Sequence, residues 1–398
     1  MIQVAERQRI RVSGRRTTYS RPLAYVRRFD WVLMAAALAL IGYGLWVVSG
    51  ITRFDVPGEP NYHVFRQAIA ACLGLAGLVV AAVLPMELAR RHWRVVYGAT
   101  LALMILVFLA AETIRGSKRW IDLGVFQFQP SELGKVLFVL AIAGFLVERQ
   151  GRVNRWRTIV QAIGLGAVPI LLVFLQPDLG TALVYGAALV AVLFFVGVRW
   201  RQLLTILAAV AFAGISIVWL LPSAGVEVLE PYQADRLTGF LDPDRDPGNL
   251  TWNANQSRTA VGAGGLTGRG VLDASQTRLD YLPEHATDFA FASLAEQRGF
   301  VGSAILLLLY LLVVWRGLRV ITVAGDLYGA VVAGGLVFAL LFQVFVNVGM
   351  TMGVAPVTGI PLPFVTVGGS SLVTNLILIG VLQGIHTRGV ARNGPSPP

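Results

Sequence analysis

The sequence predicts an all-α polytopic membrane protein with ten transmembrane helices and a large ordered extracytoplasmic loop between helices 7 and 8. Three observations support this fold class. The chain of 398 residues is 56% hydrophobic and only 14% charged, which leaves too few polar side chains to cover a water-soluble domain of this size. Its apolar residues gather in runs that approach the ~20 helical residues needed to cross a hydrocarbon layer of ~30 Å. Its arginines concentrate in alternate connections between those runs, as in multi-pass membrane proteins.

The expected helices belong to one membrane domain, residues 29–392. In chain order they cover 31–51, 64–85, 93–112, 132–148, 158–176, 178–197, 203–222, 300–318, 327–348 and 371–387. Residues 1–28 form an arginine-rich arm without the pattern of a cleavable signal peptide, so the first span is expected to stay as an anchor. Residues 393–398, NGPSPP, are expected to form a disordered tail.

The arginine pattern predicts the orientation of the chain. The N-terminal arm and the even-numbered connections are rich in arginine, and such segments remain in the cytoplasm. Both termini are therefore expected to be cytoplasmic, with membrane lipids around the helices. This orientation also accounts for the formal net charge of +11, so no nucleic-acid partner is expected.

The odd-numbered connections then face outward. They are 52–63, 113–131, 176–178, 223–299 and 349–370. The connection 223–299 is far longer than an ordinary loop, so it is either functional or disordered, and its alternating aromatic residues and paired charges favour order. A helix is expected from Asp288 to Arg319, with Thr287 as its N-cap and with Asp288 and Glu296 on one face.

An outward site has no supply of ATP, so a group-transfer reaction there needs a substrate that is already activated, such as a lipid-linked diphosphate. Residues 256–270 offer Arg258, Arg269 and closely spaced glycines, whose backbone amides can approach an anion. A flexible glycine turn is the alternative interpretation of the same stretch.

Two further patterns place ionisable groups at the ends of spans. Glu132 and Lys135 lie at i and i+3 of one expected helix, where they form either part of a site or an ion pair that only stabilises the helix. Asp178 directly follows Pro177, and its local interpretation is an N-cap that accepts from free backbone amides.

In the stretch 281–300, Glu284, His285 and Asp288 lie shortly before the start of an apolar segment. A lone histidine beside a glutamate at an interface is usually a surface residue, and no spacing of His, Cys and carboxylates matches a structural metal site. A divalent cation, Mg²⁺ or Mn²⁺, held by carboxylates beside a diphosphate stays open. No other cofactor is expected.

Several of these stretches together resemble one family, the SEDS proteins, which are peptidoglycan glycosyltransferases. The matching pieces occur in the family's order and are RWIDLGVFQFQPSELGK (119–135), LQPDLGTAL (175–183), FLDPDRDPGN (240–249), QSRTAVGAGGLTGRG (256–270), YLPEHATDFAF (281–291) and GVAPVTGIPLPFVTVGGSS (353–371). The variant PVTGIPLPF is more similar to the elongation branch of the family, RodA, than to the division branch, FtsW.

The resemblance implies a ten-helix protein of the bacterial cytoplasmic membrane that polymerises lipid II on the outer face during cell elongation. It implies a class B penicillin-binding protein as the crosslinking partner, together with other proteins of the elongation complex. The catalytic aspartate of the family's TDF motif falls on Asp288. Its PSE..K residues fall on Glu132 and Lys135, and its PDLGT aspartate falls on Asp178.

Two departures from the family pattern concern side chains near the expected base. The family commonly has a histidine directly before TDF, where this chain has Ala286, with His285 one place earlier. The usual SYGG reads Thr366, Val367, Gly368 and Gly369 here. Neither change removes Asp288.

The mechanism expected from these residues is an inverting glycosyl transfer. Asp288 would act as general base on the 4-hydroxyl of the acceptor sugar, and polyprenyl diphosphate would leave from the donor. The residues expected to bind substrate or orient the binding cations are Glu132, Lys135, Asp178, Arg258, Arg269 and Glu284. A flippase or transporter of lipid-linked precursors is the alternative function, and a noncatalytic scaffold for cell-wall enzymes is the third.

Overall fold

The computed structural model describes residues 26–110, 112–114, 117–122, 124, 127–223, 225, 240 and 251–393. Most of the expected N-terminal arm and tail, and much of the loop 223–299, lie outside these residues. The long helices are α3 (Trp31–Ile51), α4 (Tyr62–Val83), α6 (Trp93–Ala110), α7 (Pro130–Glu148), α8 (Trp156–Phe174), α9 (Leu179–Phe195), α10 (Trp200–Ile215), α16 (Ala290–Val323), α17 (Leu327–Thr351) and α18 (Gly369–Asn393).

The fold class predicted from hydropathy is confirmed. Within the described residues, nine helices are long and apolar enough to cross a membrane, and α9, with 17 residues, is a shorter apolar helix. Since a lipid interior offers no hydrogen-bond partners, helices satisfy their own backbone groups there. The apolar composition of each run therefore sets both its length and its conformation.

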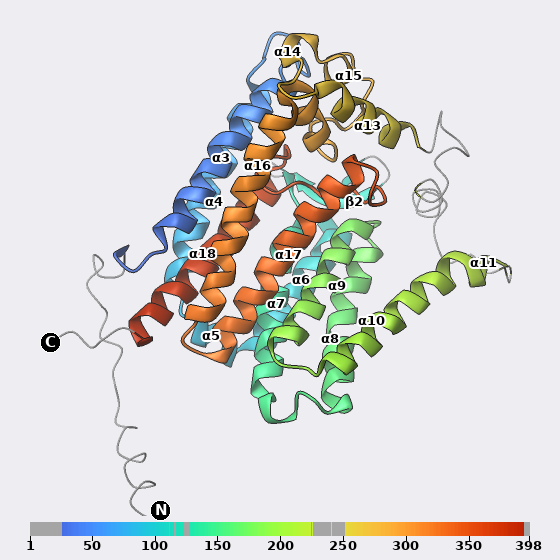
Figure 1. Ribbon diagram of the computed structural model, residues 1–398. Helices are drawn as coiled ribbons and strands as arrows, with labels where there is room; N and C mark the ends of the chain where they lie inside the picture. Colours follow the sequence, from blue (N-terminus) through green and yellow to red (C-terminus); the bar gives the residue numbers. More distant parts are fainter. Residues whose placement is uncertain are drawn as a thin grey trace, which may run out of the picture.

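The helices differ in how much of their surface lies inside the protein. In α7 and α18, 83% of the most apolar stretch is buried, whereas none of it is buried in the segment Trp200–Ser223. Within this segment only the first turns of α10 bury side chains, among them Leu203 and Ile206. Figure 1 shows α10 diverging from the other helices toward α11 (Leu221–Ser223); the two are joined by a π-helical turn, Ser216–Leu220. The outer helices thus present apolar side chains to lipid, and α7, α17 and α18 form the centre.

Small residues bring the backbones of α4 and α18 together. A Cβ atom on Gly380 would lie 2.3 Å from the Leu78 carbonyl oxygen, and one on Gly384 would lie 2.6 Å from that of Ala82. Glycine is therefore the side chain that this packing accepts, as at many helix crossings in membranes.

The described part of the long loop folds into α13 (Trp252–Gly264), α14 (Gly270–Asp273) and α15 (Ser275–Arg278). These helices lie together at the top of Figure 1, and we call them the cap and that end of the bundle the cap end. A small antiparallel sheet joins α6 to α7, in the order β1 (Glu112–Ile114), β2 (Ser117–Asp122), β3 (Gln127–Phe128). The short helix α5 (Met86–Arg91) lies at the opposite end.

A buried ion pair locks the opposite end. Arg316 Nη2 lies 2.6 Å from Asp30 Oδ2, and Arg316 Nε donates to both carboxylate oxygens. Asp30 Oδ1 also caps α3 by accepting from the Leu33 amide, and the Gln383 side chain exchanges two hydrogen bonds with the Asp30 backbone. The start of α3 and the last turns of α18 therefore lie on the same side of the bundle, as an even number of spans requires.

The expected helix from Asp288 to Arg319 is wrong in two respects. Helix α16 begins at Ala290, so Thr287 is not its N-cap, and the helix is kinked at Gly299, which has φ 65° and ψ −162°. The kink frees backbone groups, and the glycine-rich loop after α13 satisfies them: the amide of Phe300 donates to the Gly265 carbonyl oxygen at 2.9 Å. Only glycine adopts this backbone conformation without strain.

Candidate functional site

The segment 280–289 carries the predicted base and runs between the cap and the start of α16. Two buried side chains anchor it, Leu282 and Phe289, which pack with Ala260 of α13 and Ala292 of α16 in a small apolar cluster. Asp288 itself is partly exposed. It therefore lies at the cap end, in a turn directly before α16 rather than within the helix.

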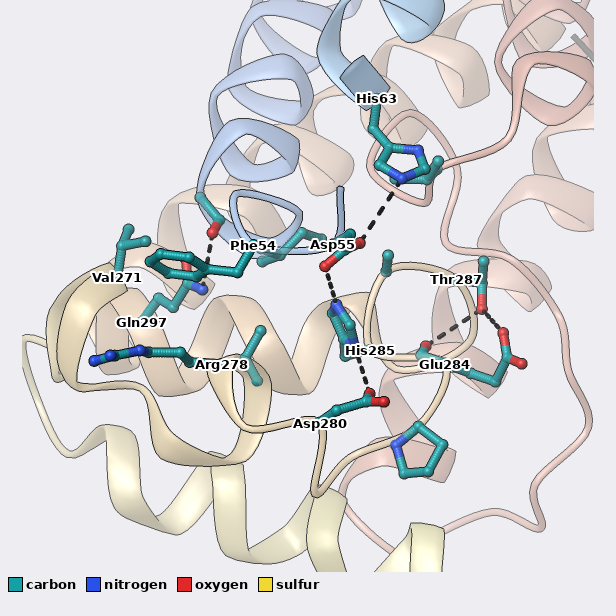
Figure 2. A pocket seen from close by; sticks show the side chains of 16 residues that line it. Phe54, Asp55, His63, Val271, Arg278, Asp280, Glu284, His285, Thr287 and Gln297 are labelled. Carbon is teal, nitrogen blue, oxygen red and sulfur yellow. Dashed lines mark hydrogen bonds and ion pairs between the residues drawn. The ribbon is translucent and has the colours of Figure 1, made fainter. Parts of the chain in front are cut away.

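A pocket of about 510 Å³ opens beside this turn (Figure 2). Its lining consists of Gly50, Ile51, Phe54, Asp55, His63, Val271, Thr277, Arg278, Asp280, Pro283, Glu284, His285, Ala286, Thr287, Gln297 and Val367. These residues come from the end of α3, the connection to α4 and the start of α4, the cap, the turn before Asp288, α16 and the segment before α18. Asp288 is adjacent to this lining in sequence but is not part of it.

His285 links two connections across the pocket (Figure 2). Its Nε2 lies 3.0 Å from Asp55 Oδ1, and its Nδ1 lies 3.6 Å from Asp280 Oδ1. Burial disfavours the charged imidazole, but the hydrogen bond and charge of Asp55 and the charge of Asp280 outweigh it, so the pKa of His285 is raised above 6.5. The other carboxylate oxygen of Asp55 faces His63 at 3.9 Å.

Glu284 lines the same pocket. Its Oε2 accepts a hydrogen bond of 2.7 Å from the Thr287 hydroxyl, and its φ of 58° reverses the chain at this point. The glutamate therefore helps to shape the turn that leads to Asp288.

A second polar cluster lies where α7 and α9 begin. Lys135 Nζ donates to Glu132 Oε2 at 3.0 Å, and both side chains are buried. Glu132 Oε1 is also buried, with no hydrogen-bond partner among the described residues. The spacing prediction that these two side chains pair on one helix face is confirmed.

Asp178 combines both interpretations of its position. It is the N-cap of α9, since Oδ1 accepts from the Thr181 amide at 3.0 Å. Its Oδ2 accepts from Gln129 Nε2 at 2.8 Å, and Arg119 Nη1 lies 3.8 Å from Oδ1. The cap therefore accounts for only part of its contacts.

The segment before α18 and the first turn of α18 connect the two clusters. Thr366 donates its hydroxyl to the Thr287 carbonyl oxygen at 2.9 Å, beside the predicted base. A few residues later, Ser370 Oγ accepts from the Gln129 amide at 3.0 Å, beside Asp178. Stretches that are far apart in the sequence thus meet at one end of the bundle.

The two arginines of the glycine-rich stretch lie on the exposed surface of the cap. Arg258 donates to Asn255 Oδ1 at 2.6 Å, and Arg269 donates to the Ala263 carbonyl oxygen at 3.2 Å. The amide of Gly268 donates to the Gly264 carbonyl oxygen and that of Arg269 to the Glu296 carbonyl oxygen. These amides serve the packing of the loop on α16, and the role of the arginines toward substrate stays a prediction.

Glu296 has a structural role that the sequence did not reveal. Its two carboxylate oxygens accept from the amides of Gln276 and Thr277 at 2.8 and 3.0 Å and from the Thr277 hydroxyl at 2.7 Å. It therefore anchors α15 to α16. Sequence reasoning also missed Asp55, because only the fold brings the α3–α4 connection to His285.

In the part of the chain that the structure describes, no three His, Cys, Asp or Glu side chains form a group that could hold a metal ion. The Mg²⁺ or Mn²⁺ that the sequence left open, held by carboxylates beside a diphosphate, stays a prediction.

Comparison with known proteins decides the family. A model of the cell cycle protein family FTSW_RODA_SPOVE matches residues 30–390. The chain belongs to this family, the SEDS proteins. The match covers all of the long helices and both polar clusters, so the resemblance carried by the sequence motifs is confirmed.

Relatives of this SEDS protein cover nearly its whole length. Peptidoglycan glycosyltransferase MrdB of Escherichia coli (strain K12) is 36% identical over 359 residues, which make up 90% of this chain and 95% of MrdB. Stage V sporulation protein E of Bacillus subtilis (strain 168) is 35% identical over 371 residues, 89% of this chain and 96% of that protein.

Solved structures agree with the fold. A chain described under "Structural coordination of polymerization and crosslinking by a peptidoglycan synthase complex" superposes with a TM-score of 0.76 at 33% identity, over 92% of this chain and 99% of that chain. The crystal structure of the Thermus thermophilus rod shape determining protein RodA gives a TM-score of 0.64 at 29% identity, over 90% and 96% of the two chains.

Proposed function

We propose that this SEDS protein polymerises lipid II into glycan strands, with Asp288 as general base. Family membership and the names of its relatives make it a peptidoglycan glycosyltransferase. The observation that best supports the finer proposal is the convergence at the cap end: the turn with Asp288 and the cluster with Glu132, Lys135 and Asp178 are joined through the segment 366–370.

The reaction requires one proton acceptor and one stabilised leaving group. The 4-hydroxyl oxygen of the acceptor sugar attacks the anomeric carbon of the donor, and the bond from that carbon to the diphosphate oxygen breaks. The hydroxyl proton passes to the Asp288 carboxylate, and the anomeric configuration inverts. A diphosphate leaves as an anion, so cations can replace a general acid.

The basic side chains that could stabilise the leaving diphosphate differ in burial and in existing partners. Lys135 is buried and already paired with Glu132, so its ammonium group would have to share its N–H donors between Glu132 and the leaving group. Arg258 and Arg269 are exposed on the cap and could follow a mobile diphosphate. Arg119, with 27% of its side chain exposed beside Asp178, is a further candidate that the sequence alone did not single out.

The pocket suits a sugar headgroup better than a diphosphate. Asp55, Asp280 and Glu284 place three carboxylates in its lining, against the single guanidinium of Arg278. Carboxylates accept hydrogen bonds from hydroxyl and amide groups and repel phosphate. We therefore assign the glycan portion of the substrate to this pocket and the diphosphate to the side of Asp178 and Lys135.

The remaining parts of the proposal concern setting and partners. The arginine pattern supports a cytoplasmic location for both termini and an outward-facing cap end. A role in elongation follows from the RodA-like sequence 353–371. The similarity to a chain of a peptidoglycan synthase complex supports a class B penicillin-binding protein as partner, with other elongation proteins around it.

The test is polymerisation of labelled lipid II by the purified protein in proteoliposomes without ATP. Glycan chains should form, and their formation should require substrate on the cap side. Movement of labelled lipid II across the bilayer with no polymer, even when the partner is present, would instead identify a flippase. If neither polymer formation nor movement of lipid II is observed, a noncatalytic scaffold for cell-wall enzymes is the interpretation that remains.

A further inference from the structure

The turn that carries Asp288 is held by an unusual run of hydrogen bonds. Three successive carbonyl oxygens accept from three different donors: that of Ala286 from the Val367 amide, that of Thr287 from the Thr366 hydroxyl and that of Asp288 from Asn347 Nδ2, each at 2.9 Å. All three donors lie in α17 or in the segment that follows it.

Asn347 is the donor that reaches the base residue itself. It is fully buried in α17, and its Nδ2 donates a second hydrogen bond, of 2.8 Å, to the Ile360 carbonyl oxygen. An amide nitrogen has two N–H groups, so both are used. Asn347 thus ties the Asp288 turn and the segment 352–368 to the same position of one membrane helix.

Thr366 is held just as firmly. Its hydroxyl oxygen accepts from the Leu362 amide at 2.8 Å while donating to Thr287. Its own carbonyl oxygen accepts from Gln67 Nε2, and Gln67 Oε1 accepts from the Gly368 amide. Through Gln67, which is buried in α4, the backbone around Thr366 is fixed relative to that helix.

Packing alone does not account for Asn347. An apolar side chain of similar size would fill the same space in a membrane helix without the cost of burying polar atoms. Asn347 Oδ1 is buried with no hydrogen-bond partner among the described residues, so this cost is not fully offset. What the asparagine adds is the pair of hydrogen bonds from Nδ2, one of which holds the residue proposed as base.

We propose that Asn347 and Thr366 are positioning residues that fix the backbone under Asp288 and so aim its carboxylate at the acceptor hydroxyl. This inference rests on the proposed function, because it gives Asp288 the role of base. Catalytic groups must be held within about 0.5 Å of the productive geometry. The Asp288 turn precedes α16 and is not part of it, so the hydrogen bonds from Asn347 and Thr366 add to those within the turn in fixing its position.

The test measures lipid II polymerisation by purified variants. Asn347→Ala should lower kcat by about 10- to 100-fold, the effect of a displacement near 1 Å, and should leave KM within about twofold because the pocket lining is untouched. The acid limb of its pH–kcat profile should shift, since the displaced carboxylate meets a different environment. A residue that only stabilises the fold would lower the yield of folded protein and leave that limb in place.

Asn375→Ala is the matched control. Asn375 is an equally buried asparagine in α18, its Oδ1 likewise has no hydrogen-bond partner among the described residues, and its Nδ2 bonds only to Ser371, one turn away. Its kcat should stay within about twofold of the parent, since a lost local hydrogen bond costs only about 1 kcal/mol of stability. Equal kcat losses in the two alanine variants would overturn the inference.

The Thr366 pair covers the case in which Asn347→Ala does not fold. Thr366→Val removes the hydroxyl with little change in shape and should lower kcat, whereas Thr366→Ser keeps the hydroxyl and should restore most of it. Parental kcat in Thr366→Val would contradict the inference. Asp288→Asn, measured alongside, separates the two levels: an active Asp288→Asn overturns the proposed base, whereas an inactive one with fully active Asn347→Ala and Thr366→Val overturns the positioning role alone.

Discussion

The two ends of the bundle each contain a buried ion pair, and the pairs differ in how completely their hydrogen bonds are satisfied. At the opposite end, both oxygens of Asp30 accept from Arg316, and one also accepts from the Leu33 amide. At the cap end, Glu132 accepts a single hydrogen bond from Lys135, and its second oxygen has no partner among the described residues. Breaking a saturated buried pair leaves an uncompensated charge and destabilises the fold, whereas a buried oxygen without a partner retains capacity for a ligand.

The largest expected effect is the loss of stability when the Asp30–Arg316 pair is broken. Asp30→Ala leaves the guanidinium of Arg316 buried, and arginine cannot release its proton, so the free energy of unfolding should fall by about 3–5 kcal/mol. Polymerisation per folded molecule should be unchanged, because the pair lies at the opposite end from Asp288. Unfolding in detergent, followed by circular dichroism, provides the measurement. A loss below 1 kcal/mol would show that saturation does not mark a structural pair.

At the cap end we expect Glu132→Gln to have a small effect on stability and a large effect on activity, the opposite of Asp30→Ala. The amide oxygen still accepts from Lys135, so the cost in stability should be only about 1–2 kcal/mol. The loss of kcat should be about 10- to 1000-fold, in the range seen when an electrostatic group of an active site is removed. The polymerisation rate of the folded variant, compared with that of Asp30→Ala, tests this. A parental kcat in Glu132→Gln would contradict a catalytic role for the Glu132–Lys135 pair.

At Asp178, two substitutions of the same residue can separate its structural role as an N-cap from a role in catalysis. Asp178→Asn keeps an N-cap acceptor of equal quality, but its NH2 group replaces the oxygen that accepts from Gln129, so the free energy of unfolding should fall by about 1 kcal/mol. It removes the charge that faces Arg119, so kcat should fall by about 10-fold if that charge orients a cation. Asp178→Ala should add a stability loss of about 1 kcal/mol. Equal kcat in Asp178→Asn and the parent would show that Asp178 acts only as the N-cap of α9.

The last expected effect concerns His285 and the pH dependence of the free energy of unfolding. Its raised pKa means that the folded state binds the proton more tightly than the unfolded state. The resulting stability is complete below pH ~6.5 and is lost as the pH rises through the folded-state pKa. His285→Gln should therefore lower the free energy of unfolding by about 1–2 kcal/mol near pH 5.5 and by much less at alkaline pH. A difference that grows with rising pH would contradict the link to Asp55 and Asp280.

The sequence was sufficient for the spans because hydropathy and length determine them locally. Helix α3 covers the expected residues 31–51, and α17 differs from the expected range only in its last turn, ending at Thr351 rather than 348. The Glu132–Lys135 pair and the Asp178 cap also follow from spacing within one helix. These features depend on neighbours at most four residues away.

What the sequence did not reveal depends on contacts between distant segments. The kink at Gly299 exists because the loop after α13 supplies hydrogen-bond partners for the freed groups of α16. His285 reaches Asp55 only because the α3–α4 connection lies against the cap end. Asn347 is one polar residue in an apolar helix, and nothing in its neighbourhood in sequence indicates that it holds the Asp288 carbonyl.

The most direct measurement of the central claim is the turnover of lipid II by Asp288→Asn, a variant of nearly equal shape that cannot accept the hydroxyl proton. The account predicts that kcat falls by about 100-fold or more, while substrate affinity and the unfolding transition stay close to those of the parent. Glycan chains formed at the parental rate by the folded variant would contradict it.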